Sequence, residues 1–243
     1  MSIGSQPNLG RVQLCVLGRF ELSVMNRPVA IPGPSQRVLA LLGVEDQLVP
    51  RSFVAGTLWP DAREAAARSN LRSALWRLGS RRSIVLQVGP DALRLEREVA
   101  VDLREHRSRA RILLDHAAKG ERVELSPGLF ESDLLPTWCD EWVEPKRESY
   151  RQLRLHSLEA ICDQLILGKR FGEALEAAFM AISTSPFRES AHRAVVVALL
   201  AGGNRCEALR HYERFRSSLK EELGVEPSFQ FDDLREQALS ATP

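Results

Sequence analysis

The chain begins with a stretch in which apolar and polar positions alternate. Residues 11–31 read RVQLCVLGRFELSVMNRPVAI, with many β-branched side chains and with breaks at Gly18 and at the turn Asn26-Arg27-Pro28. Alternation at a period of two predicts strands that bury one face. We therefore expect two or three short strands at the start of the chain.

Two stretches with helical periodicity follow these strands. The first, PGPSQRVLALLGVEDQ, begins at a Pro34-Ser35 start signal, and its spacing turns four apolar residues inward: Val38, Leu39, Leu41 and Leu42. The second is short and runs from about Arg51 to Leu58, ending before Trp59-Pro60.

A third helical stretch, residues 64–78, has two unlike faces. At about 3.6 residues per turn, Leu71, Leu75 and Leu78 fall on one face, with Ala67 and Ala74 beside them. Burying three leucines contributes roughly 1.5–3 kcal/mol each, so packing alone explains this face. The opposite face and its flanks are polar and cationic, and they carry Arg68, Ser69, Asn70, Arg72, Ser73, Trp76 and Arg77.

A hairpin pattern completes the amino-terminal part of the chain. In SIVLQVGPDALRLE we expect a strand from Ile84, a turn at Gly89-Pro90-Asp91 and a returning strand through Leu93 and Leu95. Strands, three helices and a hairpin, in that order, are typical of a winged helix-turn-helix domain. We assign that domain to residues 10–102, after a disordered tail at residues 1–9.

From Leu103 onward the strand signals nearly vanish. Asp102 followed by Glu105 forms a capping box that starts a helix running towards Ala118. The stretch ELSPGLFESDLLP interrupts the pattern, and apolar residues then recur at helical spacing from Trp138 to Leu167.

An internal repeat lies in the carboxy-terminal part. FGEALEAAF and RCEALRHYE align at an offset of 34 residues. At the same offset Gly168 aligns with Gly202, and each glycine lies just before the second helix of its repeat. This period, with small residues in the second helix, is the tetratricopeptide signature, because small side chains let paired helices pack closely. We expect residues 103–243 to form an all-α helical bundle, so that the chain is mainly α with a small β component.

The distribution of charge changes how the third helix is interpreted. The net charge of +1 argues by itself against a nucleic-acid partner. Residues 1–102, however, carry 13 basic and 9 acidic side chains, against 20 and 23 in the remainder. Such asymmetry points to a polyanion-binding module joined to another domain. Between Arg63 and Arg82 there are six arginines and a single acid, Glu64, so the helix forgoes the i,i+4 pairs of an ordinary solvated helix.

Two interpretations of this helix stay open from its own residues. It is either an arginine-rich surface helix or, given its place in the predicted domain, a recognition helix that enters the major groove of DNA. Arginine suits the second role because its planar fork binds guanine O6 and N7 together or grips a phosphate. Trp76 has an alternative of its own, since its ring could cover the core of the domain from the side.

The candidate DNA-binding residues divide by their expected partner. The base-edge candidates are Ser69, Arg72, Ser73 and Trp76. The phosphate-binding candidates are Arg68, Asn70, Arg77, Arg81 and Arg82, which position the protein without reading the sequence. Arg51 and Ser52 open the second helix, where exposed N–H groups commonly bind a phosphate. Arg94 in the hairpin either reaches the minor groove or is an ordinary surface arginine.

Signals for other functions are poor. The first residues lack the basic start and apolar core of a signal peptide, and the longest apolar run, AVVVALLA, is too short to cross a bilayer. We interpret the four scattered cysteines as reduced core thiols of a cytoplasmic protein. The histidines lack metal-ligand spacing and are expected at the surface or the edge of the core. We expect no metal, no cofactor and no enzymatic activity.

The stretches LWPDAREAAARSNLRSALWRLG and VQLCVLGRFELSV resemble the DNA-binding domain of the Streptomyces antibiotic regulatory protein family. The second half resembles the bacterial transcriptional activation domain paired with it in that family, in three stretches: LLPTWCDEWVEPKRESYRQLRLHSLEAI, SPFRESAHRAVVVALLAGGNRCEALRHYERFR and LKEELGVEPS. The resemblance covers about residues 10–240.

The resemblance implies a cytoplasmic transcriptional activator, often of secondary-metabolite (antibiotic) gene clusters. Its members resemble OmpR-type regulators in the winged helix, bind direct repeats in promoter DNA as tandem protomers, and recruit RNA polymerase. By that analogy, a loop before the recognition helix faces the sigma and alpha subunits of the polymerase, and it consists of Trp59, Pro60, Asp61, Ala62, Arg63 and Glu64.

Two departures from the family pattern bear on DNA binding. The wing reads PDALRLE where many members have Gly-Tyr, and Gly79 stands where a further arginine is common, which shortens the recognition helix. The alternative function is a tetratricopeptide-type adaptor that binds a protein, with a degenerate winged helix.

Overall fold

The computed structural model describes residues 12–121 and 127–240, so the tail expected at residues 1–9 lies outside the described residues. The described residues form two compact units. The amino-terminal unit extends to Ser108 and includes Ser132–Tyr150, and the carboxy-terminal unit comprises Arg109–Glu131 and the residues from Arg151 onward. The domain boundary after residue 102 stays a prediction, and the compact units add that Ser132–Tyr150 pack with the amino-terminal unit.

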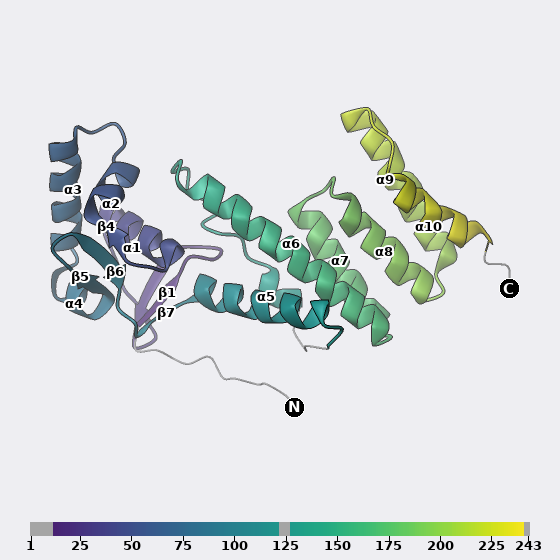
Figure 1. Ribbon diagram of the computed structural model, residues 1–243, viewed down its shortest axis with the longest axis horizontal. Coiled ribbons are helices and arrows are strands. Elements are labelled where there is room, and N and C mark those ends of the chain that lie inside the picture. The colour runs from purple at the N-terminus through teal and green to yellow at the C-terminus, as the bar shows by residue number, and fades with distance from the viewer. Residues whose placement is uncertain (1–11, 122–126, 241–243) are drawn as a thin grey trace. The chain divides into compact units, whose positions relative to one another are not determined.

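Two small sheets frame the amino-terminal unit (Figure 1). The first has the order β3-β2-β1-β7, in which β1 runs antiparallel to β2 and parallel to β7. The second has the antiparallel order β4-β6-β5. Their bounds are β1 Val12–Cys15, β2 Glu21–Val24, β3 Arg27–Pro28, β4 Val49–Pro50, β5 Leu86–Val88, β6 Ala92–Leu95 and β7 Val99–Val101.

The three expected strands at the start of the chain are present, but the hairpin begins later than predicted. Ile84 lies in a short helix, α4 (Arg82–Val85), and the strand begins at Leu86. The pattern also missed β4 and β7, because strands of two or three residues are too short to show a period and depend on distant partners.

The three helices that the periodicity predicted in the amino-terminal unit are present. They are α1 (Gly33–Glu45), α2 (Arg51–Leu58) and α3 (Glu64–Trp76). The four apolar residues expected to point inward from α1 are all buried. Gly43 permits α1 to approach β1 closely, since an added Cβ would lie 2.9 Å from a methyl carbon of Leu14.

Asp102 joins the first sheet to the helix that follows it. α5 (Asp102–Ala118) begins at the predicted residue, and the carboxylate accepts the Leu103 N–H at 2.7 Å. The predicted capping box described only part of the role of Asp102. The same carboxylate also accepts the N–H groups of Val16 and Leu17, each at 3.0 Å. Burial raises the pKa of Asp102, while these hydrogen bonds act to lower it.

The carboxy-terminal unit is helical within the described residues. The expected interruption, ELSPGLFESDLLP, spans residues 124–136, and its first three residues, 124–126, lie outside the described residues. A 3-10 turn occupies Pro127–Phe130. The helix predicted from Trp138 to Leu167 is α6, and it begins later than predicted, at Val143. The helices are α6 (Val143–Leu167), α7 (Phe171–Thr184), α8 (Glu189–Ala201), α9 (Arg205–Leu223) and α10 (Phe229–Ser240), and α5 and α6 contribute residues to both units.

The repeat seen in the sequence corresponds to two successive helical hairpins. α7 begins at Phe171 and α9 at Arg205, which preserves the offset of the sequence repeat. The small side chains of α7 are buried where the helices pack, at Ala174, Ala177, Ala178 and Ala181. The fold is therefore mainly α with a small β component, as predicted.

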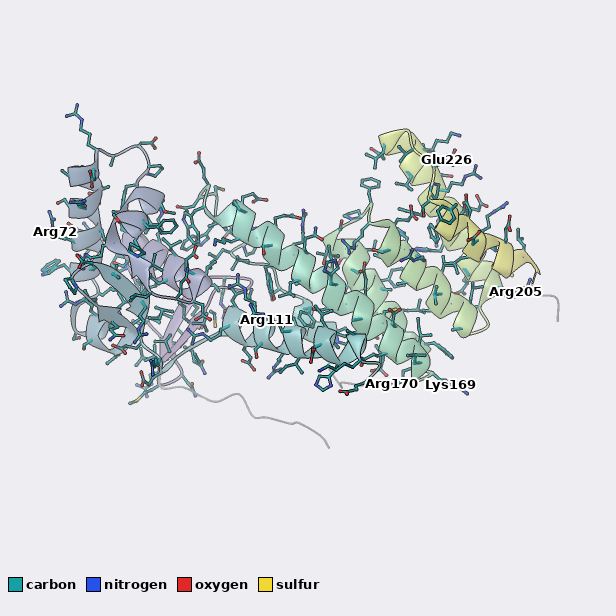
Figure 2. The ribbon with its side chains drawn as sticks, in the orientation of Figure 1. Arg72, Arg111, Lys169, Arg170, Arg205 and Glu226 are labelled. Atoms are coloured by element: carbon teal, nitrogen blue, oxygen red, sulfur yellow. The ribbon has the colours of Figure 1, made fainter. Side chains whose placement is uncertain are left out.

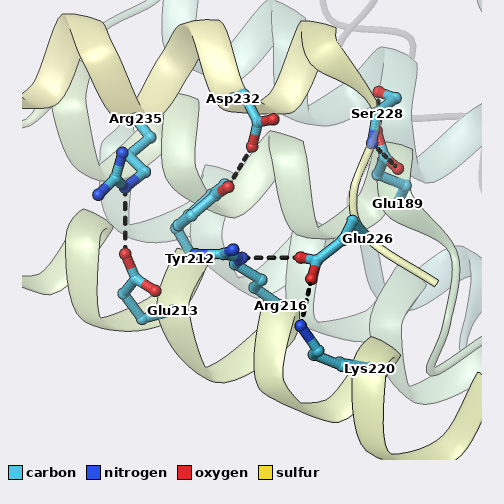
Figure 3. Close-up of polar contacts among 9 residues, drawn as sticks. All are labelled: Glu189, Tyr212, Glu213, Arg216, Lys220, Glu226, Ser228, Asp232 and Arg235. Carbon is cyan, nitrogen blue, oxygen red and sulfur yellow. Dashed lines mark hydrogen bonds and ion pairs between the residues drawn. The ribbon is translucent and has the colours of Figure 1, made fainter. Parts of the chain in front are cut away.

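The ELGVEPS stretch reverses the chain between α9 and α10 (Figure 3). Gly224 ends α9 in the left-handed conformation at φ 69°. The Glu226 carboxylate accepts hydrogen bonds from Lys220 Nζ and Arg216 Nε, each at 2.8 Å, and these bonds lower its pKa to about 2. The Ser228 N–H donates to Glu189 of α8 at 2.9 Å. This stretch therefore holds α10 against the bundle.

Some expected positions of single side chains were wrong. Cys162 is buried and Cys15 half-buried, but Cys139 and Cys206 are exposed, so these two are not core thiols; all four are free. His192 and His211 are buried rather than at the surface or the edge of the core. Their imidazole rings stack, with His192 Nδ1 lying 3.1 Å from His211 Nε2.

Candidate nucleic-acid interface

The inner face of α3 anchors the helix in the amino-terminal unit. Its predicted apolar stripe is fully buried, including Leu71, Leu75 and, just past the helix, Leu78. Ser35 of α1 adds a buried hydrogen bond, since its hydroxyl donates to the Ala74 carbonyl at 2.7 Å. Because these contacts fix the rotation of α3 about its axis, they also fix which side chains face solvent.

The opposite face of α3 is exposed along its whole length. Figure 2 shows Arg72 on the outer side of the helix. Trp76 is 78% exposed, so the alternative in which its ring covers the core is wrong. All seven candidates on this helix and its end face solvent: Arg68, Ser69, Asn70, Arg72, Ser73, Trp76 and Arg77.

The arginines of this face differ in whether they have a partner. Arg68 forms an i,i+4 salt bridge with Glu64, so the expectation that the helix forgoes such pairs was wrong at this position. No hydrogen bond or ion pair within residues 12–121 and 127–240 engages the side chains of the other arginines, which are Arg72, Arg77, Arg81 and Arg82. These four exposed guanidinium groups remain available for an anion.

The helix ends where the sequence departs from the family pattern. α3 stops at Trp76, and Gly79 adopts the left-handed conformation at φ 59°, which starts a 3-10 turn, Gly79–Arg81. A residue with a Cβ disfavours that conformation. Arg81 and Arg82 are therefore presented from a turn and a new short helix rather than from a continuation of α3.

A cleft of about 410 Å³ lies beside the exposed face, at the start of α2. Arg51, Ser52, Arg68 and Arg72 line it, together with Asp91 of the hairpin turn. The Arg51 N–H is not available to a phosphate, because it donates to the Asp91 carbonyl at 2.8 Å. Any phosphate binding at this helix start thus depends on Ser52 and the arginine side chains.

The hairpin places Arg94 on β6 opposite Gln87 of β5. The Arg94 guanidinium donates to the side-chain oxygen of Gln87. Arg94 is half-buried, and because its guanidinium is bonded to Gln87, a contact with the minor groove would require that hydrogen bond to break. The contact stays a prediction.

Five of the six residues assigned to polymerase contact, Trp59 to Arg63, form the loop between α2 and α3, whereas the sixth, Glu64, is the first residue of α3. The Trp59 N–H donates to the Ala55 carbonyl at 3.1 Å, at the end of α2. The Ala62 N–H donates to the Trp59 carbonyl at 3.1 Å. The loop lines a second cleft, of about 900 Å³, whose other side is Cys139–Trp142. No pattern in the sequence indicated this second side of the cleft, because the two stretches are far apart along the chain and neither has a recognisable motif.

The described residues offer little for other chemistry. No group of three or more His, Cys, Asp or Glu side chains among them is arranged to hold a metal ion. None of the helices in the same ranges is long and apolar enough to span a bilayer. Electrostatic binding by the α3 face is the chemistry that the geometry supports best.

The known proteins that this chain resembles in sequence are regulators of transcription and related regulatory proteins. The family model described as the bacterial transcriptional activator domain matches residues 91–239. The regulatory protein AfsR of Streptomyces griseus is 26% identical over 218 residues, which cover 86% of this chain and 22% of that protein. The transcriptional regulatory protein MoaR1 of Mycobacterium tuberculosis is 27% identical over 241 residues, covering 90% of this chain and 76% of MoaR1.

The similarity extends to a solved structure. Mycobacterium tuberculosis EmbR in complex with a low-affinity phosphopeptide matches with a TM-score of 0.78 at 21% identity, over 96% of this chain and 66% of that chain. At this identity the match establishes the shared fold. The chain spans about a quarter of the length of the AfsR proteins that it matches.

Proposed function

This chain belongs to the bacterial transcriptional activator domain family, as a regulator of the Streptomyces antibiotic regulatory protein type, and from that premise we propose that it activates transcription by binding promoter DNA through α3. One observation carries the proposal. The apolar side of α3 is buried to the last leucine, while its arginine-bearing side is exposed and, apart from Arg68, unpaired within the described residues. A fixed cationic helix of this kind suits the major groove.

The finer parts of the proposal come from the family resemblance. The protein would bind direct repeats of double-stranded DNA as tandem protomers and recruit RNA polymerase through its sigma and alpha subunits. Its targets would include a secondary-metabolite gene cluster, and it would act in the cytoplasm.

Footprinting and gel-shift assays on promoters from the genomic neighbourhood of the gene test this function. We expect a protected direct repeat and an affinity that falls steeply as the salt concentration rises, because counterions released from the phosphates return to them. The absence of a shift on every direct-repeat promoter, or a shift whose affinity does not change with the salt concentration, would contradict the proposal.

That negative result would favour the adaptor instead. The carboxy-terminal unit carries two clefts of about 440 and 430 Å³, both lined by the half-exposed Phe179. A cleft of mixed apolar and charged lining with an exposed phenylalanine at its edge, on a tetratricopeptide-like bundle, fits a protein partner. A pull-down of purified candidate proteins would then be the deciding measurement.

A further inference from the structure

The two clefts of the carboxy-terminal unit adjoin along α9. They have volumes of about 440 and 430 Å³, and three residues line both: Phe179, His211 and Arg214. Together they form one surface, here named the α9 groove, whose lining residues all belong to that unit. Along α9 the groove extends from Glu207 to Glu222, a rise of about 22 Å at about 1.5 Å per residue. This length accommodates about seven residues of an extended chain.

The wall opposite α9 is apolar. α7 contributes Leu175 and Phe179, which lie one helical turn apart, and the loop before α8 contributes Phe187. Phe179 is 50% exposed and Phe187 is 44% exposed. Two phenylalanine rings that remain in solvent beside the same groove are apolar surface that a bound partner would cover.

The floor of the groove is aromatic and uncharged at neutral pH. The rings of Phe179 and His211 meet edge to face with centroids 6.1 Å apart, and the His192 ring stacks on Phe215 at 3.8 Å. Burial lowers the pKa of His192, and burial together with the neighbouring His192 lowers the pKa of His211 to about 4. Any positive charge of the groove therefore comes from arginine.

Two arginines of α9 supply that charge at the middle of the groove. Arg210 and Arg214 are both exposed and lie one turn apart. The Nε of each donates only to a carbonyl of its own helix, at 3.4 and 3.3 Å, and no carboxylate in residues 12–121 and 127–240 pairs with either group. Like charges at this spacing destabilise a helix, so an anion bound between them would be favoured.

The two ends of the groove are acidic. Glu207 lines one end and Glu222 the other, and both side chains are exposed. A nucleic-acid backbone carries charge along its whole length, so the two carboxylates would repel it. A ligand that is anionic only near its centre, and apolar beside that charge, matches the groove instead. A peptide segment can have this pattern.

We infer that the α9 groove binds a segment of another protein in which an acidic side chain stands next to an aromatic or aliphatic one. The carboxylate binds Arg210 and Arg214, the apolar side chain covers Phe179, and the flanking residues that face Glu207 and Glu222 are neutral or basic. The inference goes beyond promoter binding by α3 and does not depend on it, because α3 and the groove belong to different compact units.

Selection from a phage-displayed library of random peptides longer than the groove tests the inference. The full wild-type chain is immobilised as bait, and the enriched peptides should carry an acidic residue next to an aromatic or aliphatic one. The most enriched peptide is then labelled with fluorescein and titrated by fluorescence anisotropy. Arg214→Glu should weaken its binding by about tenfold or more, whereas Arg214→Lys, which keeps the charge, should lose less.

Two matched controls separate the groove from the rest of the unit. Arg111→Glu makes the same change at an exposed arginine of α5 (Figure 2) that does not line the groove, and it should bind like the wild type. Phe179→Ala should weaken binding, while Phe229→Ala removes a ring that is 73% exposed outside the groove and should not. Circular dichroism checks that all of these variants fold.

The contrary outcomes are distinct. Peptides without acidic residues, no enrichment on the wild type, or equal affinity of the wild type and Arg214→Glu would each overturn the inference. A wild-type dimer that Arg214→Glu converts to a monomer in sedimentation would assign the groove to a second copy and overturn it too. The gel shift of Arg214→Glu on promoter DNA should match that of the wild type. Peptide binding without any gel shift would refute the proposed function and support the groove.

Discussion

Single residues on the outer face of α3 are expected to differ in what they contribute to DNA recognition. Arg72 lies at the centre of the exposed face and has no partner in the described structure, whereas Arg77 lies at the end of the helix. A side chain at the centre of a recognition helix reaches base edges, and one at its end reaches the phosphate backbone. Exposure alone does not separate these roles, so the distinction calls for a comparison of DNA sequences.

We predict that Arg72→Ala costs about 1–3 kcal/mol of binding free energy on the cognate site and relaxes the preference for it. Arg77→Ala should weaken binding to cognate and scrambled duplexes alike. Fluorescence anisotropy with the two duplexes measures both effects. Arg111→Ala, which removes an exposed arginine of the carboxy-terminal unit, is the control and should change neither affinity. An unchanged ratio of affinities in Arg72→Ala would show that Arg72 does not read bases.

The stacked pair His192 and His211 predicts a stability that depends on pH. Burial, and then the neighbouring His192, lowers the pKa of His211 from 6.5 to about 4, and burial also lowers the pKa of His192. The unfolded chain therefore binds protons below about pH 6.5 that the folded chain does not bind. Their contribution to stability is complete above pH 6.5 and is lost as the pH falls towards 4.

We expect the urea midpoint of the wild type to fall between pH 7 and pH 5. His211→Phe keeps a stacked ring but removes the ionisation, so its midpoint should change less over the same interval. The difference between the two proteins isolates the effect of His211 from that of carboxylates such as Asp163, whose raised pKa acts in the opposite direction. Parallel midpoint curves for the two proteins would refute the assignment.

Among the elements, the junction of β1 and α5 depends on one carboxylate. Asp102 accepts three backbone N–H groups, at the end of β1 and at the first turn of α5. The neighbouring strand β7 runs parallel to β1 and leads directly into α5. The carboxylate therefore fixes the direction in which the chain leaves the sheet.

Asp102→Ala should lower the free energy of unfolding by about 3 kcal/mol, because it leaves partly buried N–H groups without an acceptor. Asp102→Asn keeps one acceptor oxygen and should lose less. Urea unfolding measures both variants, with Glu98→Ala as the control for removal of an exposed carboxylate. Asp102 would have no such role if Asp102→Ala and Glu98→Ala unfolded at the same urea concentration.

In the whole molecule, the proposed DNA-binding and polymerase-binding surfaces belong to different segments. The first lies on α3 and the turn after it, and the second lies on the loop before α3. Activation is therefore expected to be separable from DNA binding by mutation.

Replacing Trp59 and Asp61 by alanine should abolish activated transcription in a reconstituted assay while leaving the gel shift unchanged. The physical reason is that neither side chain belongs to the exposed face of α3. Arg72→Ala should reduce both readouts together and serves as the comparison. Loss of the gel shift in Trp59→Ala/Asp61→Ala would contradict the separation.

The sequence by itself determined the helices α1 to α3, the repeat and the face of α3 that is buried. Leucines at helical spacing identify the buried side of a helix because a long amphipathic segment gains enough from burial to choose its face alone. The 34-residue offset likewise predicted the spacing between the starts of α7 and α9. For the same reason, the seven candidate side chains of α3 were expected on the exposed side, where they lie.

Only the tertiary structure decided the features that depend on distant partners. The strands β4 and β7 are too short to show a period, Asp102 needed the end of β1 beside it, and the α2–α3 loop needed Cys139–Trp142 to become a cleft. Burial of His192 and exposure of Cys139 were settled in the same way. Periodicity records the preference of a segment for one face, whereas contacts between segments far apart in the chain exist only after both have folded.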